Sequence, residues 1–236
     1  MFNFKSLLNI YIPDEFGCDE YSYPTESIDE VFAQLPDDVE TRWGVSQFCI
    51  IPADSDMVAK IPFSGEFYIV EEETFDEDGN EKILENTGFN YFHTNYCDLS
   101  YDLYLDAEDQ GLESILAKME FLGKTKNGVN VYLQEKVLPL DKDTTIGRYF
   151  KSKEERENSS KRLKEVRKKY DNTSIDWYHF PTNWAAAALD FYGEAFMVKF
   201  IKFIEENELN DFHTGNIGWR EKDNTPVILD WAGYDG

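Results

Sequence analysis

Three polar residues near the end of the chain have the types and spacing needed to bind a metal ion and accept a proton. Asn216 comes just before the strand-like segment "IGW", and Asp230 directly follows the apolar run "VIL". If residues 217–229 form a hairpin, antiparallel pairing brings Asn216 and Asp230 together. An amide oxygen and a carboxylate are suitable hard ligands for Mg²⁺. Asp211, one short loop upstream, could accept a proton nearby.

These residues lie in two segments that resemble motifs of a known enzyme superfamily. The segment "DFHTGN", residues 211–216, looks like the catalytic loop of the protein-kinase-like superfamily, and "ILDWAG" resembles its metal-binding motif. The form is most similar to small kinase-like proteins of phages and bacteria and to aminoglycoside-type phosphotransferases. The resemblance implies that Asp211 is the catalytic base and that Asn216 and Asp230 hold Mg²⁺.

The resemblance also predicts an ATP-binding lysine on an earlier strand. The segment "MVAKI" places Lys60 where kinase-like proteins carry the lysine that contacts the α- and β-phosphates, so Lys60 joins Asp211 among the catalytic residues. Val58 shares a strand face with Lys60 and is expected against the adenine. Kinases pair this lysine with a helix glutamate, and here the helix after residue 96 offers Asp98 or Asp102 instead.

Two further segments complete the implied ATP site. The segment "VYLQEKVLPL" resembles the strand that leads into the kinase hinge, so Glu135 and Val137 are expected to present backbone groups to the adenine. The glycine-rich loop is reduced to Gly44 in "RWGVSQF", which weakens the expected cradle of backbone N–H groups around the phosphates. Leu209 and Asn210 replace the His-Arg pair before Asp211.

The elements that must position these residues follow from hydrophobic periodicity and turn residues. Strands are predicted at 45–51 and 57–61. Residues 66–85 hold nine acidic residues around Asp78-Gly79 and are predicted to form an exposed hairpin or loop. Helical spacing over 96–117 is interrupted at Gly111. Strands at 117–123 and 129–137 flank the turn Asn127-Gly128, and the apolar segment 183–207 is predicted to form one helix.

Strands in the first half and helices in the second predict an α+β protein with two lobes. The N-lobe is expected to span 1–137, with an antiparallel sheet, one main helix and an N-terminal extension. A minimal helical C-lobe, 138–236, is expected to carry the catalytic loop and the metal-binding hairpin. The sequence ends six residues after Asp230, so the expected C-lobe is shorter than that of a full protein kinase.

Composition restricts the partners and the compartment. The net charge of −24 disfavours direct binding to nucleic acids or anionic membranes. No apolar run approaches the roughly 18 residues that a membrane span needs. Three widely spaced cysteines, Cys18, Cys49 and Cys97, favour reduced thiols and a cytoplasmic location. Residues 151–169 hold nine basic and four acidic residues, which predicts an exposed helix or a disordered insert and a possible docking patch.

Two functions remain open at this point. The first is an ATP- and Mg²⁺-dependent phosphotransferase, with a Ser/Thr hydroxyl on a protein as the favoured acceptor and a small-molecule hydroxyl as the second choice. The alternative is a catalytically weak or inactive kinase-like protein, a pseudokinase, whose acidic surface binds and inhibits a basic partner. The retention of Lys60, Asp211, Asn216 and Asp230 together favours the first.

Overall fold

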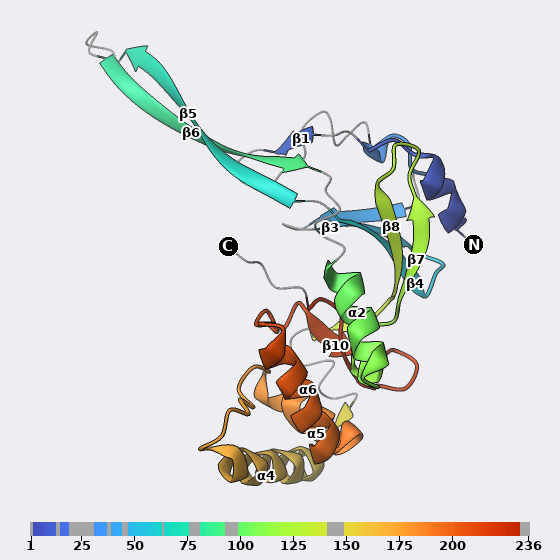
Figure 1. Ribbon diagram of the computed structural model, residues 1–236, viewed down its shortest axis with the longest axis vertical. Coiled ribbons are helices and arrows are strands. Elements are labelled where there is room, and N and C mark those ends of the chain that lie inside the picture. Colours follow the sequence, from blue (N-terminus) through green and yellow to red (C-terminus); the bar gives the residue numbers. More distant parts are fainter. Residues whose placement is uncertain are drawn as a thin grey trace. The chain divides into compact units, whose positions relative to one another are not determined.

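A computed structural model gives the fold (Figure 1) and describes residues 2–12, 15–18, 31–36, 39–43, 47–62, 64–75, 81–92, 99–140 and 149–231. Within these ranges only the backbone is described for residues 15–18, 43, 62, 64–75 and 81–92. The protein combines antiparallel sheets with several helices, so the predicted α+β class is confirmed. None of the helices in the described ranges is both long and apolar enough to cross a membrane.

The chain divides into two compact units. The first unit holds residues 1–98 and 120–134, and the second holds 99–119 and 135–236. This division differs from the predicted boundary after residue 137, because residues 99–119 belong to the second unit. Their contacts show why: the indole N–H of Trp231 donates to the carbonyl oxygen of Ser100 (2.9 Å), and the Ala117 N–H donates to that of Ile228 (2.7 Å).

A five-stranded sheet forms the core of the first unit. Its strand order is β2-β3-β4-β8-β7, with the bounds β2 (Val39–Trp43), β3 (Gln47–Pro52), β4 (Met57–Pro62), β7 (Met119–Lys124) and β8 (Asn130–Glu135). Side chains of β3 alternate between half-buried and buried, as expected for a strand with one core face. Residues of the short helix η1 (Phe4–Asn9) and the segment after it complete this core, which contains Leu7, Ile10, Ile50, Ile61 and Val131.

A second sheet of the same unit is a long hairpin with one short strand added. Strands β5 (Ser64–Phe75) and β6 (Glu81–Phe92) pair antiparallel along their whole length, and β1 (Glu15–Cys18) pairs with the last four residues of β6 (Figure 1). The predicted acidic hairpin is therefore present. Its predicted turn residues, Asp78 and Gly79, lie outside the described residues.

The second unit is mostly helical and carries the predicted catalytic loop. Its elements are α2 (Leu99–Asp109), η3 (Glu113–Ile115), β9 (Leu138–Pro139), α4 (Lys153–Tyr170), α5 (Thr182–Tyr192), α6 (Glu194–Glu206), β10 (Ile217–Trp219) and β11 (Pro226–Ile228). Gly111, with φ of 65°, follows α2 and ends it as predicted. Fully buried aromatic side chains fill the core of this unit, among them Trp177, Trp184, Phe200, Phe203, Trp219 and Trp231.

The single helix predicted over 183–207 is wrong, because Gly193 divides the segment into α5 and α6. Gly193 has φ of 83° and ψ of 162°, a conformation that residues with a side chain rarely adopt. Its N–H ends α5 by donating to the Leu189 carbonyl oxygen (3.0 Å), and its own carbonyl oxygen accepts the first bond of α6, from Met197 (3.1 Å). The break lets both helices bury their apolar faces in one core.

Candidate functional site

The predicted hairpin is present and places Asn216 beside Asp230. Strands β10 and β11 pair antiparallel, with Ile217 opposite Ile228 and Trp219 opposite Pro226. One residue beyond this ladder, the Asn216 carbonyl oxygen accepts hydrogen bonds from the backbone N–H groups of Leu229 (2.9 Å) and Asp230 (3.2 Å). Asn216 and Asp230 therefore adjoin at the open end of the hairpin, and both are half-buried.

Asn216 also holds Asp211. Its amide nitrogen donates to the Asp211 backbone oxygen and to the Asp211 Oδ2, both at 2.9 Å. These contacts turn the NH₂ group of the Asn216 side chain toward Asp211 and the amide oxygen away from it. The three residues that the sequence singled out in this region thus form one connected cluster, with Asn216 in contact with both carboxylate residues.

His213 orders the loop between Asp211 and Asn216. Its Nδ1 accepts a hydrogen bond from the Gly215 N–H (2.9 Å), and its Nε2 lies 3.6 Å from Asp211 Oδ1. A Cβ atom at position 215 would come within 2.7 Å of the His213 ring, so a larger residue there would require the ring to shift. His213 therefore holds the loop through contacts with both Gly215 and Asp211.

Two buried side chains anchor the loop and leave Asp211 accessible. Leu209 and Phe212 are almost fully buried, and the Phe212 ring packs 5.0 Å from the Phe180 ring. Asp211 stands between them with half of its side chain exposed. The apolar residues before and after Asp211 therefore fix the backbone, while its carboxylate faces solvent, as a group that must reach a substrate requires.

Neighbouring segments hold the hairpin on both edges. On one side Gly218 pairs with Pro139 of β9, and the Leu140 N–H donates to the Ile217 carbonyl oxygen (2.7 Å). On the other side Leu116 forms a parallel bridge with Ile228. A Cβ atom at position 218 would lie 2.0 Å from the Leu138 carbonyl oxygen, so only glycine permits this close pairing. The hairpin is a fixed support for the residues at its open end.

An arginine that the sequence reasoning missed ties the hairpin to segments far away in the sequence. The Arg220 Nε lies 2.9 Å from both carboxylate oxygens of Glu135, and its two terminal nitrogens donate to the carbonyl oxygens of Ser114 (2.9 Å) and Leu116 (2.8 Å). The Tyr192 hydroxyl approaches the same Ser114 oxygen (2.8 Å). Burial raises the pKa of Tyr192, which keeps this hydroxyl a donor.

The contacts of Glu135 limit which of its groups could contact the adenine. Its backbone N–H donates to the Lys118 carbonyl oxygen (2.8 Å), and its carboxylate pairs with Arg220. An adenine contact of Glu135 would therefore have to use its carbonyl group. Val137, the other predicted hinge residue, is half-buried and lies between β8 and β9. The adenine contacts of both residues stay predictions.

Lys60 lies in the first unit, on an interior strand. Strand β4 stands between β3 and β8, with Lys60 opposite Cys49, and the residue is only 6% exposed. Lysine is rarely this buried unless it is paired, and Lys60 does have an interaction partner, so it is not a solvated lysine at a strand edge. Its contact with ATP stays a prediction. Val58 is half-buried on the same strand. Gly44 and Asp98 lie outside the described residues, and Asp102 is exposed in the first turn of α2.

The donor set of the cluster fits Mg²⁺ bound together with phosphate. Within the described ranges, no group of three or more His, Cys, Asp or Glu side chains could hold a metal ion by itself. Mg²⁺ rarely needs such a cage, because it usually binds through one or two protein oxygens, several waters and substrate phosphates. The Asn216 amide oxygen and the Asp230 carboxylate match that requirement.

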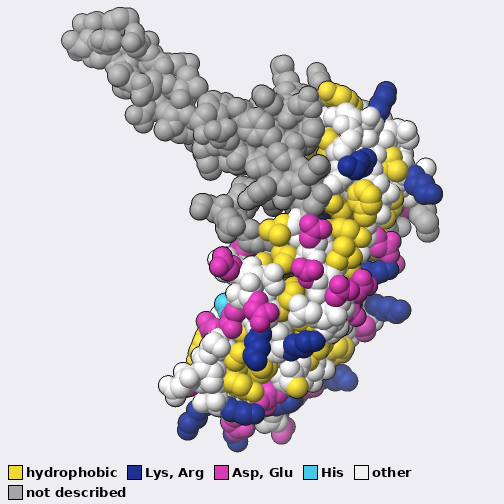
Figure 2. Space-filling model, in the orientation of Figure 1, with side chains coloured by type: hydrophobic (Ala, Val, Ile, Leu, Met, Phe, Trp, Pro, Cys, Tyr) yellow, Lys and Arg dark blue, Asp and Glu magenta, His cyan; other side chains and the backbone are white. Residues whose placement is uncertain are grey.

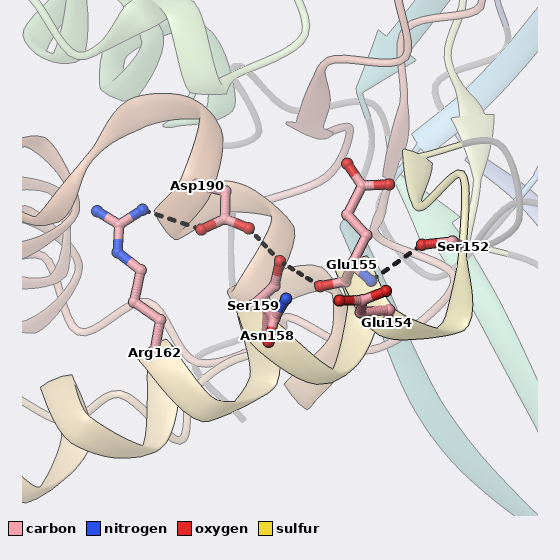
Figure 3. A pocket seen from close by; sticks show the side chains of 7 residues that line it. All are labelled: Ser152, Glu154, Glu155, Asn158, Ser159, Arg162 and Asp190. Carbon is pink, nitrogen blue, oxygen red and sulfur yellow. Dashed lines mark hydrogen bonds and ion pairs between the residues drawn. The ribbon is translucent and has the colours of Figure 1, made fainter.

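A separate open pocket of about 480 Å³ lies at the start of α4 and includes none of the predicted site residues (Figure 3). Several of its polar groups bond to one another. Asp190 accepts hydrogen bonds from the Ser159 hydroxyl and from Arg162 (2.9 Å), and Ser152 caps the helix by accepting from the Glu155 N–H (3.0 Å). The Ser152 contact caps the N-terminus of α4, and the Asp190 contacts attach α4 to α5, so these groups have a structural role.

The polar cluster at the end of the β10–β11 hairpin is therefore the best candidate site in the described part of the chain. Comparisons of the chain with protein-family models, with curated proteins and with solved structures found no match.

Proposed function

We propose that this protein is an ATP- and Mg²⁺-dependent phosphotransferase of the protein-kinase-like type, with a Ser/Thr hydroxyl of a protein as its favoured acceptor. One observation carries the proposal. The Asn216 side chain contacts Asp211 while its backbone contacts Asp230, so the proposed base and the two proposed metal ligands adjoin at the open end of the hairpin. The resemblance of "DFHTGN" and "ILDWAG" to kinase motifs assigns these same three residues to catalysis.

Asp211 would orient the acceptor hydroxyl and accept its proton. Its carboxylate is half exposed, as access to a substrate requires, and Asn216 restrains one of its oxygens. Holding the hydroxyl in line with the phosphate is the main task of the protein in this type of reaction, because phosphoryl transfer needs positioning and charge stabilisation more than covalent catalysis.

Asn216 and Asp230 would hold the metal through an amide oxygen and a carboxylate. A bound Mg²⁺ would neutralise negative charge on the transferring phosphate. The hairpin keeps both ligands in place, since β9 and residues 116–117 pair with its two edges. Lys60, from the first unit, is expected on the basis of the resemblance to contact the α- and β-phosphates of ATP.

The test compares phosphoryl transfer by the wild type, Asp211→Asn and Glu221→Gln. Asp211→Asn removes the base but keeps the size of the side chain, so we expect a loss of at least about a hundredfold in transfer from labelled ATP. Glu221→Gln removes an exposed carboxylate from the β10–β11 turn and should leave transfer unchanged. Transfer by Asp211→Asn at the wild-type rate would refute the assigned role.

A non-catalytic function remains the second candidate because the chain has a net charge of −24. On this view the acidic surface binds and inhibits a basic partner, and the kinase-like cluster is a remnant. Partner capture that is equal for the wild type and for a Lys60→Ala/Asp230→Ala variant would favour this candidate. A capture that needs both residues would favour the phosphotransferase.

A further inference from the structure

Helix α4 is a basic element in a strongly acidic protein. It has 18 residues, of which eight are Lys or Arg and four are Glu, whereas the whole chain has a net charge of −24. Figure 2 shows Lys and Arg side chains at the end of the second unit where Figure 1 places α4. The helix is therefore the segment most suited to an anionic partner.

Contacts with the rest of the second unit account for only some of the basic residues of α4. Ser159, Leu163 and Val166 are buried on the side that packs against α5. Arg162 pairs with Asp190 (2.9 Å) and Lys169 with Glu194 (2.5 Å). Three further contacts hold Arg167: the carbonyl oxygen of Trp177 (3.0 Å), the hydroxyl of Thr182 (3.5 Å) and the ring of Tyr178. These basic residues attach the helix to the rest of the unit.

Four other cations form a stripe on the outer face. Lys161, Lys164 and Lys168 follow one another at helical spacing, Arg156 lies five residues before Lys161, and all four are exposed. None of the four has an ion-pair partner among the residues that the structure describes. A shallow groove of about 210 Å³ runs between Arg156, Lys161 and Lys164, with Glu157 and the Ser160 hydroxyl at its wall.

Helix stability accounts for part of the stripe, because Lys168 lies in the last turn, where a positive charge is stabilising, and Glu165 lies four residues after Lys161. The lysines also stand close to one another. Lys161 and Lys164 are three residues apart, and Lys164 and Lys168 are four apart, so like charges are neighbours on the helix surface. Such pairs destabilise a helix, whereas opposite charges at the same spacing stabilise it. Lys153 and Glu157, which pair at 3.5 Å near the start of α4, show the favourable arrangement. An anionic ligand would relieve the repulsion within the stripe.

We propose that the outer stripe of α4 binds a short acidic segment of a protein partner. The helix is about 27 Å long, and charges further than about 8 Å away are screened at physiological salt, so the stripe acts locally despite the overall acidity. A long polyanion such as a nucleic acid would extend beyond the stripe and meet repulsion from the acidic remainder of the protein. A short peptide that carries several carboxylates matches both the length and the charge.

The experiment measures binding of a short fluorescein-labelled peptide that alternates glutamate and serine, by fluorescence polarisation at low and at physiological salt. The wild type is compared with Lys161→Glu/Lys164→Glu/Lys168→Glu. The matched control is Lys126→Glu/Lys202→Glu/Lys222→Glu, which changes the net charge equally at exposed lysines outside α4. A Lys161→Gln/Lys164→Gln/Lys168→Gln variant removes the charges without adding carboxylates, in case the reversal unfolds the helix.

We expect salt-dependent binding by the wild type, a loss of roughly tenfold or more in both stripe variants, and little change in the control. Equal losses in the stripe variants and in the control would overturn the proposal, as would an absence of peptide binding. Tighter binding of a single-stranded oligonucleotide of equal charge would overturn it in favour of a nucleic-acid partner. The experiment does not involve phosphoryl transfer, so its result tests the peptide-binding proposal independently of the proposed activity.

Discussion

At the scale of single residues, Asn216 connects the candidate site. Its side-chain nitrogen donates to Asp211, and its backbone oxygen accepts from Asp230. The same residue therefore restrains the proposed base and closes the hairpin, and its amide oxygen is the one proposed to bind Mg²⁺. A substitution there should affect stability and activity together.

Asn216→Asp separates these contributions because it keeps an oxygen for the metal and removes the amide donor. Loss of the hydrogen bonds to Asp211, with two carboxylates now adjacent, should lower the free energy of unfolding by about 1–3 kcal/mol. Phosphoryl transfer should fall by roughly a hundredfold as Asp211 loses its restraint. Urea unfolding and a transfer assay give the two values. The control is Asn172→Asp, an exposed position just after α4. An unchanged stability would contradict the observed contacts.

Arg220 and Glu135 form an ion pair whose contribution to stability can be measured. Both side chains are mostly buried, with 19% and 28% exposed, so removing one partner leaves the other poorly solvated. Arg220→Gln and Glu135→Gln should each cost about 2–3 kcal/mol of unfolding free energy. The double variant should cost clearly less than the sum, with a coupling of at least about 1 kcal/mol in a double-mutant cycle. Additive losses would show that the pair contributes little.

At the scale of elements, the contact between β9 and β10 depends on Gly218. A Cβ atom at this position would overlap the backbone oxygen of Leu138, which cannot move away as a flexible side chain could. Gly218→Ala should therefore lower the thermal midpoint strongly. Gly111→Ala is the comparison, since that site has open space and only an unfavourable φ of 65°, with an expected cost of about 1 kcal/mol. Equal effects of the two substitutions would contradict the close pairing.

The attachment of α4 to α6 should respond to acid. The hydrogen bond from Lys169 lowers the pKa of Glu194 below its ordinary value of 4.5, and the Tyr170 hydroxyl adds to the effect. A carboxylate with a lowered pKa in the folded state stabilises the fold above its ordinary pKa, and this contribution disappears as the pH falls through the lowered value. The stability lost in Glu194→Gln should therefore be visible at neutral pH and fade below about pH 4.

Thermal unfolding of the wild type and Glu194→Gln across this pH range measures the difference. Glu165→Gln, a substitution of an exposed glutamate on α4, serves as the control and should show no such pH dependence. The raised pKa of Lys169 contributes fully below the ordinary value of 10.5 and loses its effect only at alkaline pH, so it does not change across this range. A difference that grows as the pH falls would contradict the assigned contact.

Most elements could be predicted because local patterns determine them. Gly111 ends α2, the Asn127-Gly128 turn joins β7 and β8, and the β10–β11 hairpin has the predicted ends. The break at Gly193 was missed because apolar residues at helical spacing continue on both sides of it, and only a common core requires the bend. Contacts of Arg220 with Ser114, Leu116 and Glu135 join residues about a hundred positions apart, and no local pattern indicates them.

At the scale of the whole molecule, charge is distributed unevenly among the elements. The chain has a net charge of −24, with nine acidic residues between Glu66 and Glu85, while α4 carries an excess of basic residues. The proposed chemistry needs the opposite sign near the phosphates, which Mg²⁺ at Asn216 and Asp230 and the ammonium group of Lys60 would supply. Binding of ATP should therefore depend strongly on the metal.

The most direct test of the proposed activity is calorimetry of ATP binding with and without Mg²⁺, on the wild type, Asp230→Asn and Glu221→Gln. We expect binding by the wild type only when Mg²⁺ is present, a loss of at least about tenfold in affinity for Asp230→Asn, and wild-type affinity for Glu221→Gln. An absence of Mg²⁺-dependent ATP binding by the wild type at millimolar ATP would contradict the phosphotransferase. So would full binding by Asp230→Asn.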